Sequence, residues 1–272
     1  MKRAYDLSFT HVYPYLASCI GFLNVWIKNK EMKKILFSLV ACTVLLSLFL
    51  MLASSRQDDD QNSWIPDTVK DFDGNIYHTV TIGHVVWMAE NLRTTRFKNG
   101  TAIPLVTDSF EWISMKSPGY CWYDNNQALY WETYGALYNW YAVNSGKLCP
   151  KGWHVPTEND WYSIARYIAE EDLIGGKLKE KGTAHWKSPN EGATNEFGFT
   201  VLPGGFRGRA FEGLGLCTFL WSAVENDAMN SYCTGFTFNS SKLYTAEIAK
   251  FTGIYVRCVM DEYLEDDGPD KQ

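Results

Sequence analysis

A cysteine and a histidine five positions apart are the pair of residues in this chain best suited to chemistry. They are Cys149 and His154 in the stretch LCPKGWHVP, which also holds two prolines, a glycine and a tryptophan. A thiolate beside an imidazole could act as nucleophile and base, and the same side chains could supply half of a metal site. A third interpretation is structural, with Cys149 in a disulfide, and the compartment of the protein decides between them.

A secretory signal is predicted over residues 32–55. Lys33 and Lys34 precede an uncharged apolar run of about 19 residues, and small residues follow at 53–55. Such a run also has nearly the length needed to span a bilayer, so an uncleaved N-terminal anchor is the alternative. Both interpretations export the rest of the chain, to the cell surface, the outer membrane or the medium. Contact with a membrane is then expected only through the N-terminal segment.

The residues before this signal, 1–31, have no charged region, apolar run and cleavage site of their own. We interpret them as an over-extended start, with Met32 as the true initiator. The stretch LVAC ending at Cys42 has the form of a lipobox. Lipid attachment at Cys42, which would make the protein a lipoprotein, is therefore an alternative to release.

The composition excludes one class of partner. The chain of 272 residues has a net charge of −6 and no basic stripe, so the electrostatic footprint of a nucleic-acid-binding protein is missing. Aromatic residues make up 15%, which suits β-rich domains and surfaces that stack on sugars or peptides. A polar linker at 56–71 and an acidic tail at 262–272 flank the predicted globular domain, residues 72–261.

Five of the seven cysteines lie beyond the predicted signal, widely spaced and without a C-x-x-C pair. A zinc site of the usual spacing is therefore not expected, and disulfides are the default in an oxidising compartment. Because five is an odd number, one thiol stays free or pairs outside the chain. The five are Cys121, Cys149, Cys217, Cys233 and Cys258.

Two segments before the opening motif show regular patterns. Residues 75–88 alternate apolar and polar positions around Gly83, which predicts a β-hairpin with a tight turn. Residues 134–142 place aromatic and apolar side chains at helical spacing, and Asn144 and Gly146 follow as stop signals. This second pattern predicts a short amphipathic helix.

The strongest helical pattern follows the opening motif directly. Thr157 and Asp160 resemble a capping box, and apolar residues recur on one face from Trp161 onward. Gly175 and Gly176 are expected to close the connection after this helix. From residue 197 onward, short β-branched and aromatic stretches alternate with glycine-rich loops, and two helices followed by several strands predict an α+β fold.

Six collinear stretches resemble the Fibrobacter succinogenes major paralogous domain, over residues 72–261. That family is similar to C-type-lectin-like domains and to the formylglycine-generating-enzyme fold. It occurs in exported proteins of Bacteroidota and Fibrobacter, often behind a lipoprotein signal, and has no established activity. The stretches are TIGHVVWMAENLRTTRFKNGTAIP (81–104), CWYDNNQALYWETYGALYNWYAV (121–143), LCPKGWHVPTENDW (148–161), GGKLKEKGTAHWKSPNEGATNEFGFTVLPGGFR (175–207), WSAVEND (221–227) and VRCVMD (256–261).

The resemblance implies an architecture and a crosslink. In a C-type-lectin-like domain the N- and C-terminal strands pair, two short helices flank short antiparallel strands, and long loops carry ligands. The long-range disulfide of that fold implies a bond between Cys149 and Cys258. Cys217 and Cys233 are a second candidate pair, which would leave Cys121 unpaired. The opening motif is then a structural corner, in which His154 hydrogen-bonds a neighbouring backbone group.

The catalytic alternatives are weaker. Formylglycine-generating enzymes use two cysteines near the end of the domain, where this chain offers Cys233 and Cys258 without that family's active-site sequence. No nucleophile elbow, H-E-x-x-H motif or phosphate-binding loop is present. We therefore expect no enzyme activity, and a diverged formylglycine-generating-enzyme-like oxidase is the alternative.

Calcium is the one cofactor that the loops could hold. Hard cations need several carboxylate and amide oxygens that converge from loops. Asp124, and the run Glu225, Asn226 and Asp227, could supply them. The chain lacks the sugar-binding tripeptides of true C-type lectins, however, so turn formation is the alternative role of these residues and no cofactor is expected.

The favoured function is an exported binding or structural module of the cell envelope that recognises a glycan or a surface protein. Exposed aromatic residues in the loops between 183 and 239 would make the contact. A pilus or surface-matrix component is a further alternative. The candidate ligand-binding residues are Trp186, Arg207, Phe211, Trp221 and Glu225.

Overall fold

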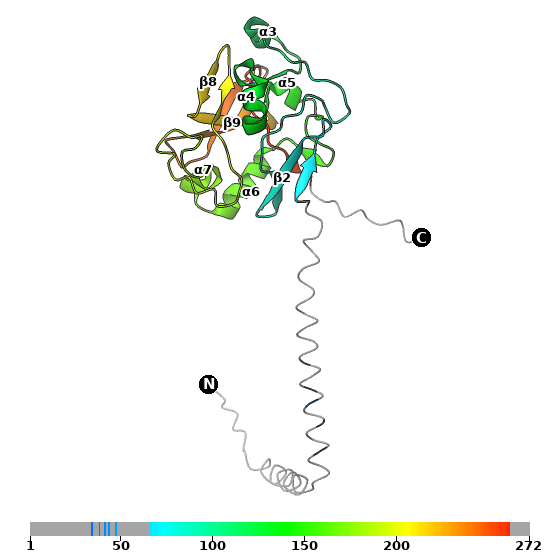
Figure 1. Ribbon diagram of the computed structural model, residues 1–272, viewed down its shortest axis with the longest axis vertical. Helices are drawn as coiled ribbons and strands as arrows, with labels where there is room; N and C mark the ends of the chain where they lie inside the picture. Colours follow the sequence, from blue (N-terminus) through cyan, green and yellow to red (C-terminus); the bar gives the residue numbers. More distant parts are fainter. Residues whose placement is uncertain are drawn as a thin grey trace, which may run out of the picture. The chain divides into compact units, whose positions relative to one another are not determined.

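The computed structural model describes residues 66–261 (Figure 1) and, within a helix nearer the N-terminus, Lys34, Ser38, Ala41, Thr43 and Ser47. The chain divides into two units, 1–64 and 65–272, and the fold described below belongs to the second unit. The predicted start at 1–31, most of the signal at 32–55 including Cys42, most of the linker and the tail at 262–272 lie outside the described residues. None of the helices in the described part of the chain is long and apolar enough to cross a membrane.

The second unit contains short helices and many short strands. Its helical segments are α3 (Ser109–Ser114), η2 (Tyr123–Asn125), α4 (Gln127–Tyr134), α5 (Trp140–Val143), α6 (Glu158–Ile168), η3 (Glu171–Leu173) and α7 (Ile174–Leu178). Its strands are β1 (Thr68–Lys70), β2 (Ile76–Ile82), β3 (Val85–Met88), β4 (Tyr120–Cys121), β5 (Leu137–Tyr138), β6 (Trp153–His154), β7 (Gly204–Arg207), β8 (Phe211–Leu214), β9 (Cys217–Glu225), β10 (Asn230–Thr237), β11 (Tyr244–Ala249) and β12 (Val259–Met260).

The first sheet joins the two ends of the domain. Its order is β1-β2-β3-β12-β6, so the last strand lies between the N-terminal hairpin and β6. The predicted hairpin is present as β2 and β3, with Ile82 opposite Val85 and Gly83 at φ +67° in the turn. Val259 pairs with Trp87 on one side and with His154 on the other.

The second sheet has the order β11-β10-β9-β7-β8. Its strands are antiparallel except β7 and β9, which meet as a parallel pair. A separate two-stranded sheet joins β4 to β5. The mixture of short helices and mostly antiparallel strands confirms the α+β class predicted from the sequence.

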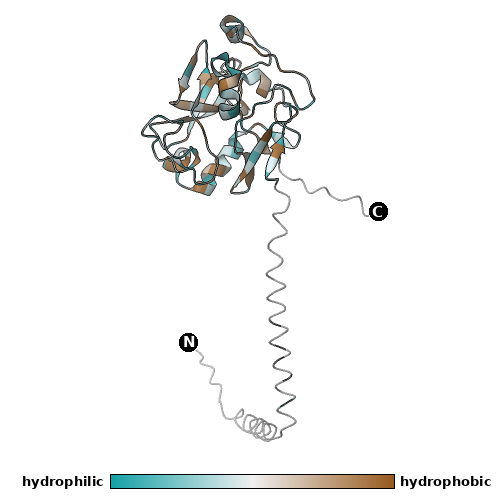
Figure 2. Ribbon diagram, viewed as in Figure 1, coloured by the Kyte–Doolittle hydropathy of each residue, from teal (hydrophilic) through white to brown (hydrophobic). Residues whose placement is uncertain are grey.

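Helix α6 forms where the sequence predicts it and packs against both large sheets. The capping box between Thr157 and Asp160 is present, and the helix ends at Ala169 in the left-handed conformation. The ring of Trp161 lies 4.7 Å from that of Trp87 in β3 and 6.4 Å from that of Phe236 in β10, measured between centroids. In Figure 2, hydrophobic and hydrophilic stretches alternate along the helices and strands, as expected for elements with one buried face.

The helix predicted at 134–142 is wrong. Helix α4 ends at Tyr134, β5 follows, and only α5 is helical within that stretch. Gly135 has φ +81°, and a Cβ added there would lie 2.8 Å from the carbonyl oxygen of Leu92, so this position breaks the helix. The apolar spacing arises because Tyr134, Leu137 and Tyr138 are all buried in the core, not because they share one helix face.

Gly175 and Gly176 were expected in the connection after α6, and this prediction is wrong because both lie inside α7. Both allow close backbone contact. A Cβ at Gly175 would lie 2.4 Å from the carbonyl oxygen of Lys242, and one at Gly176 would lie 2.3 Å from that of Gly192. These glycines therefore let α7 touch two loops that β-carbons would hold away.

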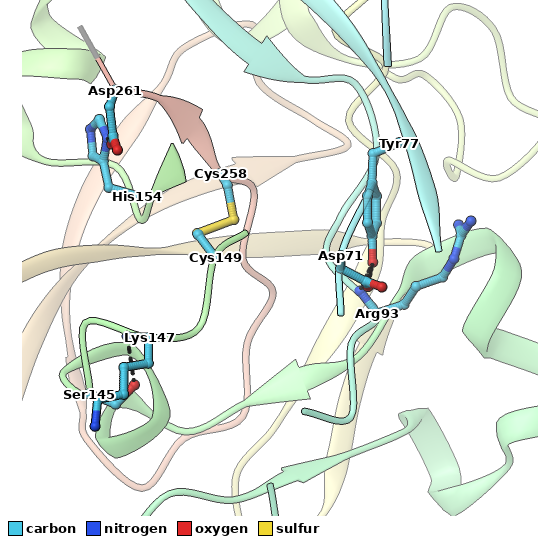
Figure 3. Close-up of a disulfide and its surroundings, with 9 residues drawn as sticks. All are labelled: Asp71, Tyr77, Arg93, Ser145, Lys147, Cys149, His154, Cys258 and Asp261. Carbon is cyan, nitrogen blue, oxygen red and sulfur yellow. Dashed lines mark hydrogen bonds and ion pairs between the residues drawn. A yellow bond between two sulfur atoms is a disulfide. The ribbon is translucent and has the colours of Figure 1, made fainter. Parts of the chain in front are cut away.

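The disulfide between Cys149 and Cys258 is confirmed. Their Cα atoms are 6.0 Å apart, and 109 positions separate them in the sequence. Closing a loop of this length in the unfolded chain contributes about 4 to 5 kcal/mol on the chain-entropy model. Figure 3 shows the bond beside His154 and Asp261, so the crosslink lies at the junction of β6 and β12.

Candidate binding groove

The two tryptophans predicted to contact a ligand are core residues. Trp186 is 1% exposed and Trp221 is 0% exposed. Each indole N–H donates to a backbone carbonyl, that of Val201 for Trp186 at 2.9 Å and that of Tyr138 for Trp221 at 2.7 Å. Their prediction as surface residues is therefore wrong, because both rings are packed in the core, where a backbone carbonyl accepts from each indole N–H.

Arg207 is also buried, at 1% exposure, and it fixes a loop. Its guanidinium donates to the carbonyls of Val106 and Thr107 at 2.6 and 2.8 Å. It also stacks between rings, 4.5 Å from the centroid of Trp112 and 4.9 Å from that of Phe211. Arg207 and the partly buried Phe211 are thus held by internal contacts and are not free to meet a ligand as predicted.

The calcium candidates make turn contacts in place of a converging oxygen cage. Glu225, which is exposed, forms an ion pair with Lys250. Asn226 accepts a hydrogen bond from the Tyr232 hydroxyl at 2.8 Å. Asp227 accepts from the backbone N–H groups of Met229 and of Asn230, the first residue of β10, at 2.6 and 2.8 Å.

Asp124, the remaining calcium candidate, lies in η2 and outside the turn that holds the other three. Across the described part of the chain, no three or more His, Cys, Asp or Glu side chains are arranged to hold a metal ion. These positions therefore fit the alternative role of turn formers.

The second disulfide predicted from the sequence is wrong. Cys217 and Cys233 lie on neighbouring strands, but Cys233 is opposite Trp221 while Cys217 is opposite Thr237. The offset of four residues corresponds to roughly 13 Å along the strands, too far for a disulfide. Both thiols are free, as is that of the buried Cys121. Burial raises their pKa values, to about 11 for Cys217 and about 12 for Cys233, so neither thiol ionises readily.

A groove of about 770 Å³ runs along helix α6. The turn of the β2–β3 hairpin borders one side, and β6 and the end of β12 border another. Three parts of the chain that are distant in sequence therefore meet here. The lining residues are Gly83, His84, Val85, Val86, His154, Asn159, Asp160, Ser163, Arg166, Tyr167, Met260 and Asp261.

His154 lies at the inner end of the groove between two carboxylates. Its Nδ1 is 2.7 Å from Asp261 Oδ1, and its Nε2 is 3.3 Å from Asp160 Oδ2. The expectation of a backbone partner is wrong, because β6 and β12 pair so that the imidazole faces Asp261 (Figure 3). The hydrogen bond with Asp160, followed by that with Asp261, raises the pKa of His154 despite partial burial.

Asp160 serves both the helix cap and the histidine. Its Oδ2 accepts from the backbone N–H and the hydroxyl of Thr157 at 2.7 and 2.6 Å. Burial acts to raise the pKa of Asp160, but the hydrogen bonds from His154 and Thr157 outweigh it and lower that pKa. The Asp160 carboxylate is therefore ionised at neutral pH, and its hydrogen bond with His154 favours the protonated form of the imidazole.

Exposed tyrosines stand on the outer face of α6. Tyr167 is 59% exposed, and its ring packs against Phe197 with centroids 6.0 Å apart. The hairpin turn lies behind it, since a Cβ on Gly83 would be 3.3 Å from the Tyr167 side chain. Tyr162 is 63% exposed, with the guanidinium of Arg166 5.9 Å from its ring centroid.

Several polar side chains in the groove are open to a ligand. Within residues 66–261, the side chains of His84, Asn159 and Arg166 make no hydrogen bond or ion pair. Ser163 donates its hydroxyl to the Asn159 carbonyl and keeps its acceptor capacity. The groove therefore offers free donors and acceptors beside an exposed aromatic ring.

A second, smaller hollow of about 360 Å³ lies on the other side of α6, over β9, β10 and β11. Tyr162, Tyr232 and Leu243 line it, and Asn159 borders both hollows. Its lining is mainly apolar, and the buried thiol of Cys233 forms part of it. The larger groove is the better candidate site because its polar groups can fix the orientation of a ligand.

The sequence contained a partial signal for this site. The predicted buried stripe of α6 left Tyr162, Arg166 and Tyr167 on the outer face, which is where the structure places them. No pattern, however, connects that face with His84 and Asp261, because the pairing of β3 with β12 brings these residues to the groove.

These observations define an α+β domain with one antiparallel and one mixed five-stranded sheet, a long-range disulfide and a ligand-sized groove along one helix. The model of the Fibrobacter succinogenes major domain matches residues 80–260, and the chain belongs to this family. The match lies within the domain predicted at 72–261. Searches of curated proteins and of solved structures found no match.

Proposed function

We propose that this chain is an exported, non-catalytic binding module of the cell envelope that recognises a glycan in the groove along α6. The observation that carries the proposal is the exposed ring of Tyr167 beside the open polar side chains of His84, Asn159 and Arg166. An aromatic ring stacks on the apolar face of a sugar, while polar neighbours bond its hydroxyls. The groove volume of about 770 Å³ also suits a ligand of a few sugar units.

Export is supported by two independent features. The sequence at 32–55 has the charge and apolar pattern of a secretory signal or N-terminal anchor. The disulfide between Cys149 and Cys258 is of the kind that persists in oxidising compartments and is rare in the cytosol. We propose the cell surface, the outer membrane or the medium as the place of action, with release, anchoring or lipidation at Cys42 as the three routes.

We propose further that the domain has a C-type-lectin-like fold. Three features support it: β12 pairs with β3 of the N-terminal hairpin, a long-range disulfide ties the end of the domain to Cys149, and long loops connect short elements. In such folds the ligand-binding loops are often ordered by calcium. Here a basic side chain orders such a loop, because Arg207 donates hydrogen bonds to the carbonyls of Val106 and Thr107.

The absence of catalysis is part of the proposal. The alternative, a diverged formylglycine-generating-enzyme-like oxidase, would use Cys233 together with Cys258, whereas Cys258 is bonded to Cys149. His154 is held by two carboxylates and has no nucleophile beside it among its hydrogen-bond partners. Both features support a binding role over a chemical one.

Glycan binding by the purified full-length chain tests the proposal. A glycan array identifies the ligand, and titration calorimetry compares the wild type with Tyr167→Ala and with Tyr244→Ala. Tyr244 is also exposed, at 42%, but lies outside the groove on β11, so its loss should have no effect. We expect Tyr167→Ala to weaken binding about tenfold or more.

Two further results bear on the same proposal. Equal binding with calcium and with a chelator is expected, because the calcium candidates are engaged in turn contacts. If the wild-type chain binds no glycan under either condition, or if both tyrosine variants bind as well as the wild type, the proposed function is wrong.

A further inference from the structure

The charges that line the groove are not equally available to a ligand. Asp160 and Asp261 are both bonded to His154, and Asp160 also accepts two hydrogen bonds from Thr157. These hydrogen bonds favour the protonated imidazole between the two carboxylates. Both acidic side chains of the groove therefore have a hydrogen-bond partner before any ligand arrives.

Arg166 is the charged residue of the groove that has no partner. Among residues 66–261 it forms no ion pair and no hydrogen bond, and its guanidinium carbon lies 5.9 Å from the ring centroid of Tyr162. Because no acceptor engages its N–H groups, the donor edge of the guanidinium is free. A planar guanidinium with a free edge is suited to bind a carboxylate through two parallel hydrogen bonds.

A second side chain with free hydrogen-bonding capacity, that of His84, lies on the hairpin side of the groove. His84 is exposed in the hairpin turn, lines the groove and has no hydrogen-bond partner in the described structure. It can donate one hydrogen bond when neutral and two when protonated. Arg166 on α6 and His84 on the hairpin thus present donors to the groove from two elements.

The stacking platform adjoins these donors. Tyr167 follows Arg166 directly in α6 and lines the same groove, and the hairpin turn at Gly83 supports the tyrosine from behind. A sugar ring that stacks on Tyr167 could therefore direct a ring substituent toward Arg166. A neutral sugar would leave this cation without a counter-charge, whereas an acidic sugar would supply one.

We propose that the groove selects glycans that contain uronic acids, with Arg166 as the carboxylate-binding residue and His84 as a supporting donor. This inference rests on the proposed function and specifies its ligand class. Arg166 is the charged side chain of the groove that has no ion-pair partner within residues 66–261. A carboxylate placed against it gains charge-assisted hydrogen bonds that a neutral glycan on the tyrosine platform cannot make.

The test uses the full-length chain and three oligosaccharides of equal length: a galacturonate oligomer, a galactose oligomer and a sulfated galactose oligomer. Titration calorimetry is expected to give about tenfold tighter binding of the galacturonate oligomer than of the galactose oligomer. Added salt should weaken the first and leave the second unchanged, because the charge pair is partly exposed and screened.

Two arginine variants locate the preference. Arg166→Gln should abolish the roughly tenfold advantage of galacturonate, and the ratio of the two affinities is the readout, because glutamine can still donate to a hydroxyl but cannot pair with a carboxylate as a cation. Arg209→Gln is the matched control, because Arg209 is also exposed and stacks on a ring, that of Phe110 at 4.8 Å, outside the groove. Arg209→Gln should change neither affinity.

The outcomes separate this inference from the proposed function. If the wild type binds galactose and galacturonate equally and Tyr167→Ala weakens both, the acid selectivity is wrong and the glycan-binding function stands. A preference for the sulfated oligomer, or an unchanged preference in Arg166→Gln, also overturns the assignment of a carboxylate to Arg166. If none of the oligomers binds, and the array with neutral glycans is negative as well, the proposed function itself fails.

Discussion

Replacing Lys179 by methionine should destabilise the domain strongly, although the side chain forms no ion pair within residues 66–261. Lys179 is fully buried and its ammonium donates to the backbone carbonyls of Glu191, Thr237 and Ser240 at 3.0, 2.9 and 2.9 Å. The three bonds tie the loop after α7 to the loop after β10. Burial lowers the pKa of Lys179 to about 8, so the group is still mainly protonated at neutral pH and can make all three bonds.

The magnitude follows from the groups left without a partner. Methionine keeps most of the apolar stem of lysine but leaves three buried carbonyl oxygens unsatisfied, at about 1 to 3 kcal/mol each. Removing a buried charge offsets part of this loss, and we expect a net destabilisation of about 3 kcal/mol. For a domain of this size the melting temperature should fall by about 6 to 12 °C.

Thermal unfolding followed by near-ultraviolet circular dichroism measures the effect. Lys181→Met is the matched control, because Lys181 lies two positions away and is exposed, so its variant should melt within about 2 °C of the wild type. Equal melting temperatures for Lys179→Met and Lys181→Met would refute the conclusion that this ammonium holds the two loops together.

Three further predictions concern stability. The pKa of His154 is raised above 6.5 in the folded chain, so the stability that its hydrogen bonds with the two carboxylates contribute should be complete below about pH 6.5 and lost as the pH rises through the folded-state pKa. The urea midpoints of the wild type and of His154→Gln should therefore converge at alkaline pH. Replacing Cys149 and Cys258 together by serine should cost about 4 to 5 kcal/mol in denaturant unfolding, whereas Cys217→Ser should cost less than about 1 kcal/mol. Gly135→Ala should destabilise the domain by about 2 kcal/mol more than Gly146→Ala, because Gly146 also has a positive φ but a Cβ there meets nothing within 4 Å; equal losses would contradict the clash with Leu92.

The features that could be predicted from the sequence are those set by neighbouring residues. The hairpin follows from alternation around Gly83, and α6 follows from its capping box and one-faced apolar stripe. The Cys149–Cys258 bond came from the resemblance to a known family, not from local pattern. The family assignment itself is confirmed by the match at residues 80–260.

The features that could not be predicted depend on contacts between distant residues. Trp186 lies in a polar stretch typical of a surface loop and Trp221 lies in β9, yet both are in the core, where carbonyls of other segments accept from their indoles. The break at Gly135 depends on the approach of Leu92, which no local periodicity encodes. The groove likewise requires Asp261 to reach His154 through the pairing of β12 with β6.

The position of β12 has a consequence for the order in which the domain can form. Val259 and Met260 fill the space between β3 and β6, and Cys258 beside them is the partner of Cys149. A nascent chain that has been synthesised only as far as residue 250 therefore holds two unjoined pieces of the first sheet, and its Cys149 lacks its disulfide partner. Folding of this sheet must wait until the last part of the domain is synthesised, and a prematurely terminated chain would remain open to proteases.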